Sequence, residues 1–143
     1  GFARHARHFT IRPVFTGVSI SMAFLLAGIS GFLAVALGAF GAHGLKQRLS
    51  ADMMAVYETA VQYHFYHTLA LLLVAVMLQQ GVQSAALRAS VWLFGLGIVV
   101  FSGSLYALAI SGVKILGAIT PIGGVLFLIG WACLAYTGFR SLS

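Results

Sequence analysis

Residues 101–131 read FSGSLYALAISGVKILGAITPIGGVLFLIGW, and this stretch decides the class of fold. Two groups of small and polar residues, at 102–104 (SGS) and 120–124 (TPIGG), stand inside otherwise unbroken apolar sequence. In a lipid bilayer every backbone polar group needs an internal partner, so hydroxyls, glycines and a proline at such a depth need a structural reason. Close packing of helices is the usual reason, and a binding site is the less usual one.

The composition of the whole chain points the same way. Apolar residues make up 61% of it and charged residues 7%, against about 45–50% and about 25% in globular proteins. A soluble domain of 143 residues could not cover its surface with so few charges, which predicts an integral protein of the lipid bilayer. The net charge of +6 does not indicate nucleic-acid binding, because the basic residues stand at the ends of apolar runs, where membrane topology places them.

Four apolar stretches are each long enough to cross a hydrocarbon core as a helix, which takes about 20 residues. They run from about Ser19 to Ala42, Val61 to Leu78, Ala89 to Ser111 and Pro121 to Phe139. The loops between them are short, so consecutive helices should be antiparallel neighbours. The sequence therefore predicts an all-α membrane protein with four transmembrane helices in an up-down-up-down bundle.

Two shorter segments carry signals for a helix start. Ser50 can cap a helix and Asp52 would meet its dipole favourably in the first turn, which predicts an interfacial helix over residues 50–60 before the second transmembrane helix. Thr120 as a cap and Pro121 at the first helical position would leave residues 112–119 as a short connection at the interface. The alternative is a longer helix kinked at Pro121.

Residues 1–21 form a basic N-terminal extension that we separate from the transmembrane domain, residues 22–143. The extension holds three arginines and no acidic residue, which is typical of an organellar targeting segment or the positive end of a signal peptide. A native cytoplasmic flank, or sequence upstream of a start at Met22, are the alternatives. Counting the extension, five basic residues share the side of the termini against three on the other, which predicts that both termini lie inside.

Small residues repeat at helical spacing on the first and third helices. Such residues let helix backbones approach closely in lipid, where association depends on van der Waals contact. Both stripes are predicted to be internal seams of the bundle, and a homodimer face is the alternative. The first stripe is Ala27, Gly31, Ala34, Gly38 and Gly41; the second is Gly95, Gly103, Ala107 and Ser111, with Val99 at the intervening position.

Three histidines stand near the first turn of the bundle: His43, His64 and His67. Neutral imidazole can bind a metal, hold haem or relay a proton, and His43 and His67 with Tyr63 could hold a ligand at the turnaround between helices 1 and 2. Histidine and tyrosine also serve as interfacial anchors and interhelical hydrogen-bond partners, which needs no ligand.

A second polar group consists of Ser102, Ser104, Tyr106 and Thr120. These residues could line a small polar cavity between helices 3 and 4, or bond their own and neighbouring helices as Ser and Thr usually do in membranes. No serine here has a histidine base on its own helix, no loop has the phosphate-binding pattern, and Asp52 and Glu58 are the only acids in the chain. The sequence therefore predicts no enzymatic activity.

Four motifs together resemble the "domain of unknown function 423" family of small bacterial membrane proteins, which are similar to mitochondrial transmembrane protein 256. The motifs are GAFGAHGL (38–45), YETAVQYHFYHTLAL (57–71), FSGSLYAL (101–108) and TPIGGVLFLIGW (120–131). The resemblance implies a four-helix protein of the bacterial inner (plasma) membrane, with the mitochondrial inner membrane as the alternative, and no established activity. His64 is outside the family's signature positions, which include His43, Tyr63, His67, Ser102, Ser104, Tyr106, Thr120, Pro121, Gly123 and Gly124.

Three functions remain open from these observations. The leading hypothesis is a non-enzymatic accessory or assembly component of a membrane complex, with other membrane subunits or a second copy as partners. The second is a small-molecule or ion transporter or channel acting as an oligomer. The third is binding of a metal, haem or quinone by His43, Tyr63 and His67. The sequence does not identify a cofactor, and no nucleic-acid partner is expected.

Overall fold

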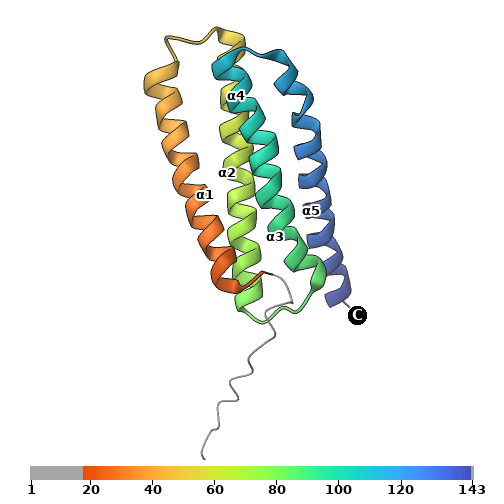
Figure 1. Ribbon diagram of the computed structural model, residues 1–143. Helices are drawn as coiled ribbons and strands as arrows, with labels where there is room; N and C mark the ends of the chain where they lie inside the picture. Colours follow the sequence, from red (N-terminus) through yellow and green to blue (C-terminus); the bar gives the residue numbers. More distant parts are fainter. Residues whose placement is uncertain (1–17, 143) are drawn as a thin grey trace, which may run out of the picture.

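The computed structural model describes residues 18–142 and shows four long helical rods lying side by side (Figure 1). The first rod is α1 (Ile20–Phe40) with a π-helical end, η1 (Gly41–Leu45), and the second is α2 (Ala51–Gln79). The third rod joins α3 (Ala85–Gly97), the π-helical turn η2 (Ile98–Ser102) and α4 (Gly103–Ser111). After the short 3₁₀ helix η3 (Lys114–Ala118), α5 (Thr120–Ser141) forms the fourth.

All four rods are long enough to cross a membrane. They contain 26, 29, 27 and 28 residues, the last counted from η3. At a rise of about 1.5 Å per residue each exceeds the hydrocarbon core of about 30 Å. The prediction of an all-α bundle with four transmembrane helices is confirmed, and the described residues 18–142 contain no strand.

Serine hydroxyls and two glycines set the ends of the helices. Ser19, Ser50 and Ser84 each accept a hydrogen bond from the backbone N–H three residues ahead, at 3.1–3.2 Å, so the cap predicted at Ser50 is confirmed. Gly81 and Gly112 have φ of +93° and +71°, the left-handed region that only glycine enters without strain. They reverse the chain direction after α2 and α4.

Two predicted boundaries differ from the structure. Residues 51–60 are helical as expected, but they are the first turns of α2 and not a separate interfacial helix, because nothing interrupts the helix before Gln79. Thr120 does not cap α5: it is the first helical residue, Ile119 occupies the cap position, and the Thr120 hydroxyl bonds Ser104 instead. Pro121 lies in the first turn as predicted, and η3 is the short connection before it.

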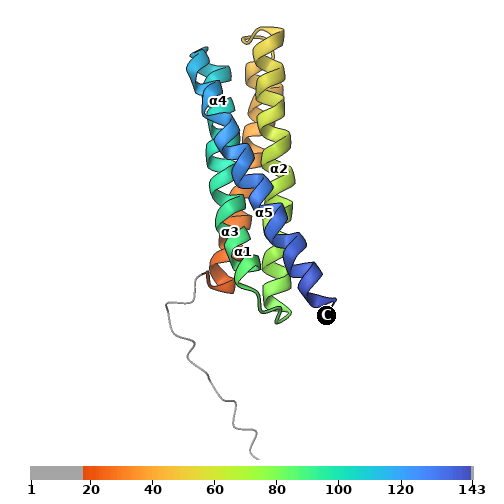
Figure 2. The same ribbon diagram turned by 90° about the vertical axis from the view of Figure 1, so that its right-hand side faces the viewer.

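Each rod packs mainly against its neighbour in the chain. α1 packs against α2, α2 against the third rod, and α3 with η2 against α5. α1 and α5 therefore stand at opposite edges of the bundle in Figure 1, and Figure 2, turned by 90°, shows α5 in front of the other rods and α1 behind. The main hydrophobic core lies where α1, α2, α3 and α5 meet, around Leu71, Val91, Phe94 and Phe127.

The small-residue stripe of α1 is an internal seam, as predicted. Ala27 and Ala34 are buried against α2, and a side chain on Gly31 or Gly38 would meet Thr68 or Val61 at ordinary contact distance. At the end of the seam the Tyr57 ring covers Gly41 and donates a hydrogen bond to the Leu37 carbonyl at 2.5 Å. Small residues on α1 thus bring its backbone close to α2.

The third rod and α5 interlock by a different arrangement, in which a ring on one helix covers a glycine on the other. Phe94 covers Gly130, and Phe127 covers Gly97, so the same F-x-x-G spacing on two antiparallel helices forms a reciprocal pair. Near the start of α5, Gly123 lies directly against the backbone of Phe101 in η2. These contacts need glycine because an added Cβ would overlap the ring or the backbone.

The small-residue stripe of the third rod is not an internal seam, so this prediction is wrong. Among the described residues, no atom beyond the glycine's own turn of helix would lie within 4 Å of a Cβ on Gly95 or Gly103, and Val99 is 68% exposed. The inner face of the rod is formed instead by larger residues such as Leu87, Val91 and Phe94, which are fully buried. We call the stripe formed by Gly95, Val99, Gly103, Ala107 and Ser111 the outer small-residue face.

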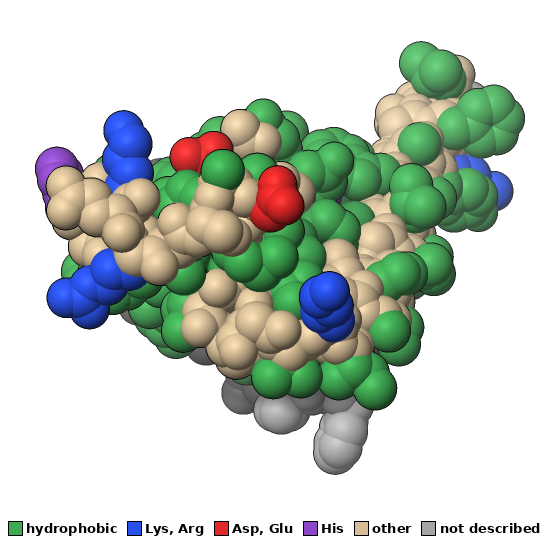
Figure 3. Space-filling model, turned by 90° about the horizontal axis from the view of Figure 1, so that it is seen from above, with side chains coloured by type: hydrophobic (Ala, Val, Ile, Leu, Met, Phe, Trp, Pro, Cys, Tyr) green, Lys and Arg blue, Asp and Glu red, His purple; other side chains and the backbone are tan. Residues whose placement is uncertain are grey.

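Charged side chains gather at the ends of the bundle and leave its sides apolar. One end, formed by the turn after η1 and by η3, carries Lys46, Arg48, Asp52 and Lys114, and Figure 3 shows this end with charged groups around hydrophobic side chains. Arg88 and Arg140 belong to the opposite end, where α1 begins and α5 ends. The predicted basic extension, residues 1–21, lies almost wholly outside the described residues, and α1 begins at Ile20, one residue after the predicted start of the first span at Ser19.

Candidate functional site

A chain of hydrogen bonds centred on His64 crosses three helices inside the bundle. His64 is 4% exposed; its Nδ1 lies 2.9 Å from the Tyr106 hydroxyl of α4, and its Nε2 lies 3.1 Å from the Ser30 hydroxyl of α1. Ser30 also bonds Thr68 at 2.6 Å, and Thr68 donates to the His64 carbonyl at 2.8 Å. The chain therefore ties α1, α2 and α4 together.

The donor and acceptor of every hydrogen bond in this network follow from the bond between Thr68 and the His64 carbonyl. A carbonyl oxygen only accepts, so Thr68 uses its one hydroxyl proton there and must accept from Ser30. Ser30 then accepts from His64 Nε2–H, which leaves Nδ1 to accept from the Tyr106 hydroxyl. His64 is thus a neutral imidazole with its proton on Nε2.

His67, one turn further along α2, is enclosed by aromatic rings. Its imidazole stacks on Phe127 with centroids 3.5 Å apart and planes 7° apart, and Phe94 and Trp131 lie 5.8 and 5.9 Å away. Nδ1–H donates to the Tyr63 carbonyl at 2.7 Å, and Nε2 accepts from Trp131 Nε1–H at 3.1 Å. Both nitrogens are therefore occupied, and the proton of His67 is on Nδ1.

The two buried histidines are accordingly expected to be neutral and to hold opposite tautomers. Solid-state ¹⁵N NMR of the histidine-labelled protein in lipid should show one ring protonated at Nε2 and the other at Nδ1. His64→Gln and His67→Gln would assign the two sets of signals. A spectrum with the same tautomer for both rings, or with a doubly protonated ring at neutral pH, would contradict the hydrogen-bond directions given above.

The second predicted polar group, Ser102, Ser104, Tyr106 and Thr120, does not line one cavity, because its members form separate hydrogen bonds between different pairs of helices. Ser102, fully buried, donates to the Ala60 carbonyl of α2 at 2.8 Å. Ser104 donates to the Phe101 carbonyl at 2.9 Å and lies 2.6 Å from the Thr120 hydroxyl, which connects α4 to α5. Tyr106 belongs to the His64 chain instead. Within residues 18–142 no buried side-chain polar atom lacks a hydrogen-bond partner.

The structure does not bring His43 and His67 together. Gly41 of the first rod lies opposite Tyr57, and Gly31 lies opposite Thr68, so His67 is at the level of Gly31. His43 is twelve residues beyond Gly31 on the first rod. Twelve residues of helix separate the two levels by about 18 Å. His43 is exposed at the end of the bundle, whereas His67 is buried near its middle. In the described part of the chain no three His, Cys, Asp or Glu side chains form a metal-binding group.

Several residues of the site could not be selected from the sequence. Ser30 and Thr68 complete the His64 chain, and Trp131 donates to His67. Ser30 and Thr68 are single hydroxyls in apolar helices, which bond their own backbone more often than a distant side chain. The one signal for the set was the spacing of four between His64 and Thr68, which places them on the same side of α2.

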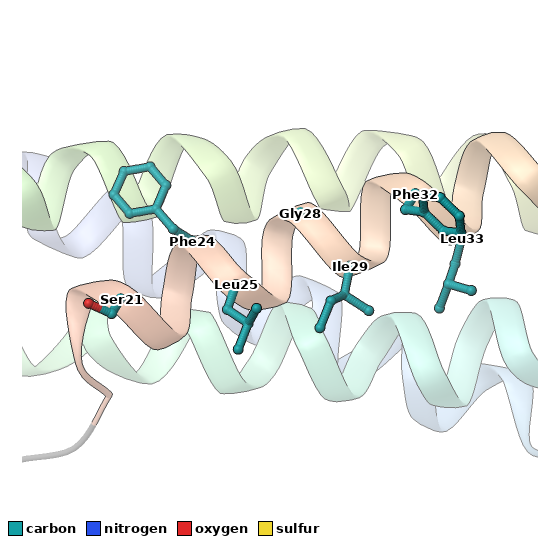
Figure 4. Close-up of a pocket in the computed structure, with 7 residues that line it drawn as sticks. All are labelled: Ser21, Phe24, Leu25, Gly28, Ile29, Phe32 and Leu33. Carbon is teal, nitrogen blue, oxygen red and sulfur yellow. The ribbon is translucent and has the colours of Figure 1, made fainter.

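Two surface depressions lie away from these residues. One follows the outward side of α1 and is apolar except for the hydroxyl of Ser21; Figure 4 shows its lining residues, Ser21, Phe24, Leu25, Gly28, Ile29, Phe32 and Leu33. The other lies at the end of the bundle between the start of α3 and the end of α5, where Ser84 and Thr137 are hydrogen-bonded at 2.9 Å. Neither depression includes the two buried histidines.

Comparison with known proteins assigns a family. Residues 37–124 match the family described as "Protein of unknown function (DUF423)", which is more than half of the chain. The chain belongs to the DUF423 family. The matched region of this DUF423 protein contains His43, Tyr63, both buried histidines and all four members of the second polar group. It does not contain Ser30 or Trp131, which are the α1 and α5 partners of His64 and His67.

Curated relatives of this DUF423 protein are bacterial membrane proteins. A UPF0382 membrane protein of Haemophilus influenzae is 49% identical and the match covers 82% of this chain and 94% of the relative. A UPF0382 membrane protein of Staphylococcus saprophyticus is 47% identical over 81% and 95%. The UPF0382 inner membrane protein YgdD of Escherichia coli is 46% identical over 81% and 88%. No solved structure matches the DUF423 chain.

These relatives and the four membrane-length helices confirm the predicted localisation, an integral membrane protein of the bacterial type. They also confirm the family resemblance noted from the four sequence motifs. The names of these relatives describe membrane proteins and state no activity. Any more specific function of this DUF423 protein therefore has to be argued from its own geometry.

Proposed function

We propose that this protein is a non-enzymatic accessory or assembly component of a membrane complex. The observation that carries the proposal is the outer small-residue face of the third rod. Its five residues follow one another at a spacing of four, and Val99, Ala107 and Ser111 are exposed. Within residues 18–142, no other helix comes within 4 Å of a Cβ added at Gly95 or Gly103. In lipid, a face of this composition favours close approach of another transmembrane helix.

The buried polar groups support a structural role as well. The hydroxyls and imidazoles of the interior bond one another, and the His64 chain ends on a backbone carbonyl. A carbonyl oxygen accepts a hydrogen bond but carries no proton to pass on. This arrangement favours a rigid interior over a proton path, and it gives the transporter hypothesis less support than the assembly hypothesis.

The proposal predicts that bulky residues on the outer small-residue face prevent assembly without unfolding the chain. Gly95→Leu with Gly103→Leu should abolish cross-linking of the protein to its partner in native membranes, because the added side chains hold the partner helix away. Each new side chain enters open space, so the free energy of unfolding should change by no more than about 1 kcal/mol.

The matched control is Gly28→Leu. Gly28 also has open space around it, but it belongs to the outward side of α1. Cross-linking should persist in Gly28→Leu and be lost in the double variant of the third rod. Equal cross-linking in both variants would remove the outer small-residue face as the contact surface. An unassembled monomer as the native form of the unmodified protein would refute the accessory function itself.

A further inference from the structure

Two tyrosines on α2, Tyr63 and Tyr66, have exposed side chains. The side chains of Tyr63 and Tyr66 are 38% and 57% exposed, and their rings contact each other with centroids 5.9 Å apart. Among residues 18–142 neither hydroxyl has a hydrogen-bond partner, although every buried polar side-chain atom in the same residues has one. The two phenols can therefore each donate a hydrogen bond to a group outside the described residues.

These tyrosines lie near the middle of the bundle, because His67, next to Tyr66 in the sequence, is level with Gly31, which is close to the midpoint of the first rod. α2 runs from Ala51 to Gln79, which is about 43 Å of helix, and its midpoint is Phe65. Tyr63 and Tyr66 are within two residues of that midpoint, about 3 Å along the axis. Tyrosines of membrane proteins are enriched at the water interface, where the hydroxyl is hydrated. At the bilayer centre no water is available, so an unpaired hydroxyl is unfavourable.

The surface around the two phenols is formed by aromatic rings from three rods. The Tyr63 ring lies 4.7 Å from that of Phe101 and is stacked parallel to the His67 imidazole at 6.0 Å. The Trp131 indole donates a hydrogen bond to His67, and Trp131 is itself 42% exposed. A partner helix needs small residues to approach closely, and this surface is bulky. A flat ring fits it better.

We propose that Tyr63 and Tyr66 bind the ring of a bilayer-soluble quinone. The two phenols donate hydrogen bonds to its carbonyl oxygens, which only accept, and aromatic rings prefer to stack or meet edge to face at such distances. The isoprenoid tail of the ligand remains in the lipid, so no entry channel is needed. His67 joins α2 to α5 beside these phenols, because its Nε2 accepts a hydrogen bond from Trp131.

This site differs from the one predicted at the turnaround of helices 1 and 2, because His43 is not part of it. It is also independent of the proposed assembly role, since the outer small-residue face belongs to the third rod and the phenols belong to α2. Failure of one proposal therefore leaves the other standing.

The test uses the full chain in lipid nanodiscs, with Trp92→Phe so that Trp131 is the one remaining tryptophan. Decylubiquinone is titrated while Trp131 fluorescence is recorded, and decylbenzene serves as the ligand without carbonyl groups. Saturable quenching by the quinone, absent with decylbenzene, is expected. Tyr63→Phe and Tyr66→Phe should each raise the Kd about fivefold and together about 25-fold, the range expected for loss of one and two hydrogen bonds.

Tyr136→Phe is the matched control, because Tyr136 is an exposed tyrosine near the end of α5 and should leave the Kd unchanged. Removal of an unpartnered hydroxyl does not threaten folding, so the variants remain comparable. Quenching that rises linearly with quinone content, or saturates equally in the double variant, would overturn the proposal. It would also be overturned if the double variant lost contact with a partner protein in cross-linking while quinone quenching stayed the same.

Discussion

Replacing Gly123 with alanine should lower the free energy of unfolding by about 3 kcal/mol, the upper part of the range for overpacking a tight interior. An added Cβ would lie 2.7 Å from the Cα of Phe101 and nearer still to its backbone nitrogen. Because the obstacle is backbone, no side-chain rotation can relieve the overlap. The start of α5 would have to move away from η2, which would also disturb the bond between Thr120 and Ser104.

The neighbouring glycine gives a control within the same turn. A Cβ on Gly124 would lie 3.9 Å from the ring of Phe101, which is ordinary van der Waals contact. Gly124→Ala should therefore change the free energy of unfolding by less than about 1 kcal/mol. Titration with SDS in mixed micelles, followed by circular dichroism, measures both. Equal stability of the two variants would show that α5 does not approach η2 as closely as described.

Replacing His64 with leucine should lower the free energy of unfolding by about 2 kcal/mol. The substitution introduces an apolar side chain of similar size and removes two interhelical hydrogen bonds, each worth about 0.6–2 kcal/mol in a membrane. It leaves the Tyr106 hydroxyl without its partner on α2, while Ser30 keeps its bond to Thr68. The same SDS titration measures the change.

The double variant His64→Leu with Tyr106→Phe distinguishes two contributions to the loss of stability. One is the lost hydrogen bond, and the other is the cost of leaving the Tyr106 hydroxyl buried without a partner. Removing both partners of a buried hydrogen bond is less unfavourable than removing one, because no desolvated polar group remains. The double variant should therefore be about 1 kcal/mol more stable than His64→Leu alone. If the second substitution lowers stability further by its full single-variant cost, the two residues are not coupled and the proposed chain is not formed.

Composition and span length were sufficient to predict the fold. Four apolar stretches can cross a bilayer only as helices, and short loops make neighbours antiparallel, so few arrangements remain. Boundaries were harder because apolar sequence does not mark the residues at which a helix begins and ends. α2 begins ten residues before the apolar stretch that starts at Val61, since Ser50 and Asp52 start a helix that simply continues into the membrane.

Of the two internal seams that were predicted, the one on α1 is correct and the one on the third rod is wrong. Small residues show that another backbone can come close to a face, but they do not show which helix does so. On α1 the neighbour is α2 of the same chain. On the third rod the neighbouring helices instead meet large residues, and the contact with α5 alternates rings and glycines, as Phe94 with Gly130. Such pairs require both helices to be placed before they can be identified.

The candidate site was predicted poorly because its residues come from different helices. Residue spacing along one helix does not give the distances between helices. The sequence places His43 and His67 near one turn, but His67 is sixteen residues into α2 and so lies deep in the bundle. His64 was given less weight than His67, yet it forms the chain that ties α1, α2 and α4 together. Its partners come from helices 34 and 42 residues away in sequence.

The pairing of each rod with its neighbour in the chain has a consequence for biogenesis. Residues 18–79 contain both members of the α1–α2 hairpin, so this hairpin can form in the membrane while the ribosome is still synthesising the rest of the protein. The third rod and α5 form a second hairpin in the same way once α5 has left the translocon. We therefore expect assembly to end with lateral docking of the two hairpins along α2 and the third rod, where Ser102 and Tyr106 bond α2.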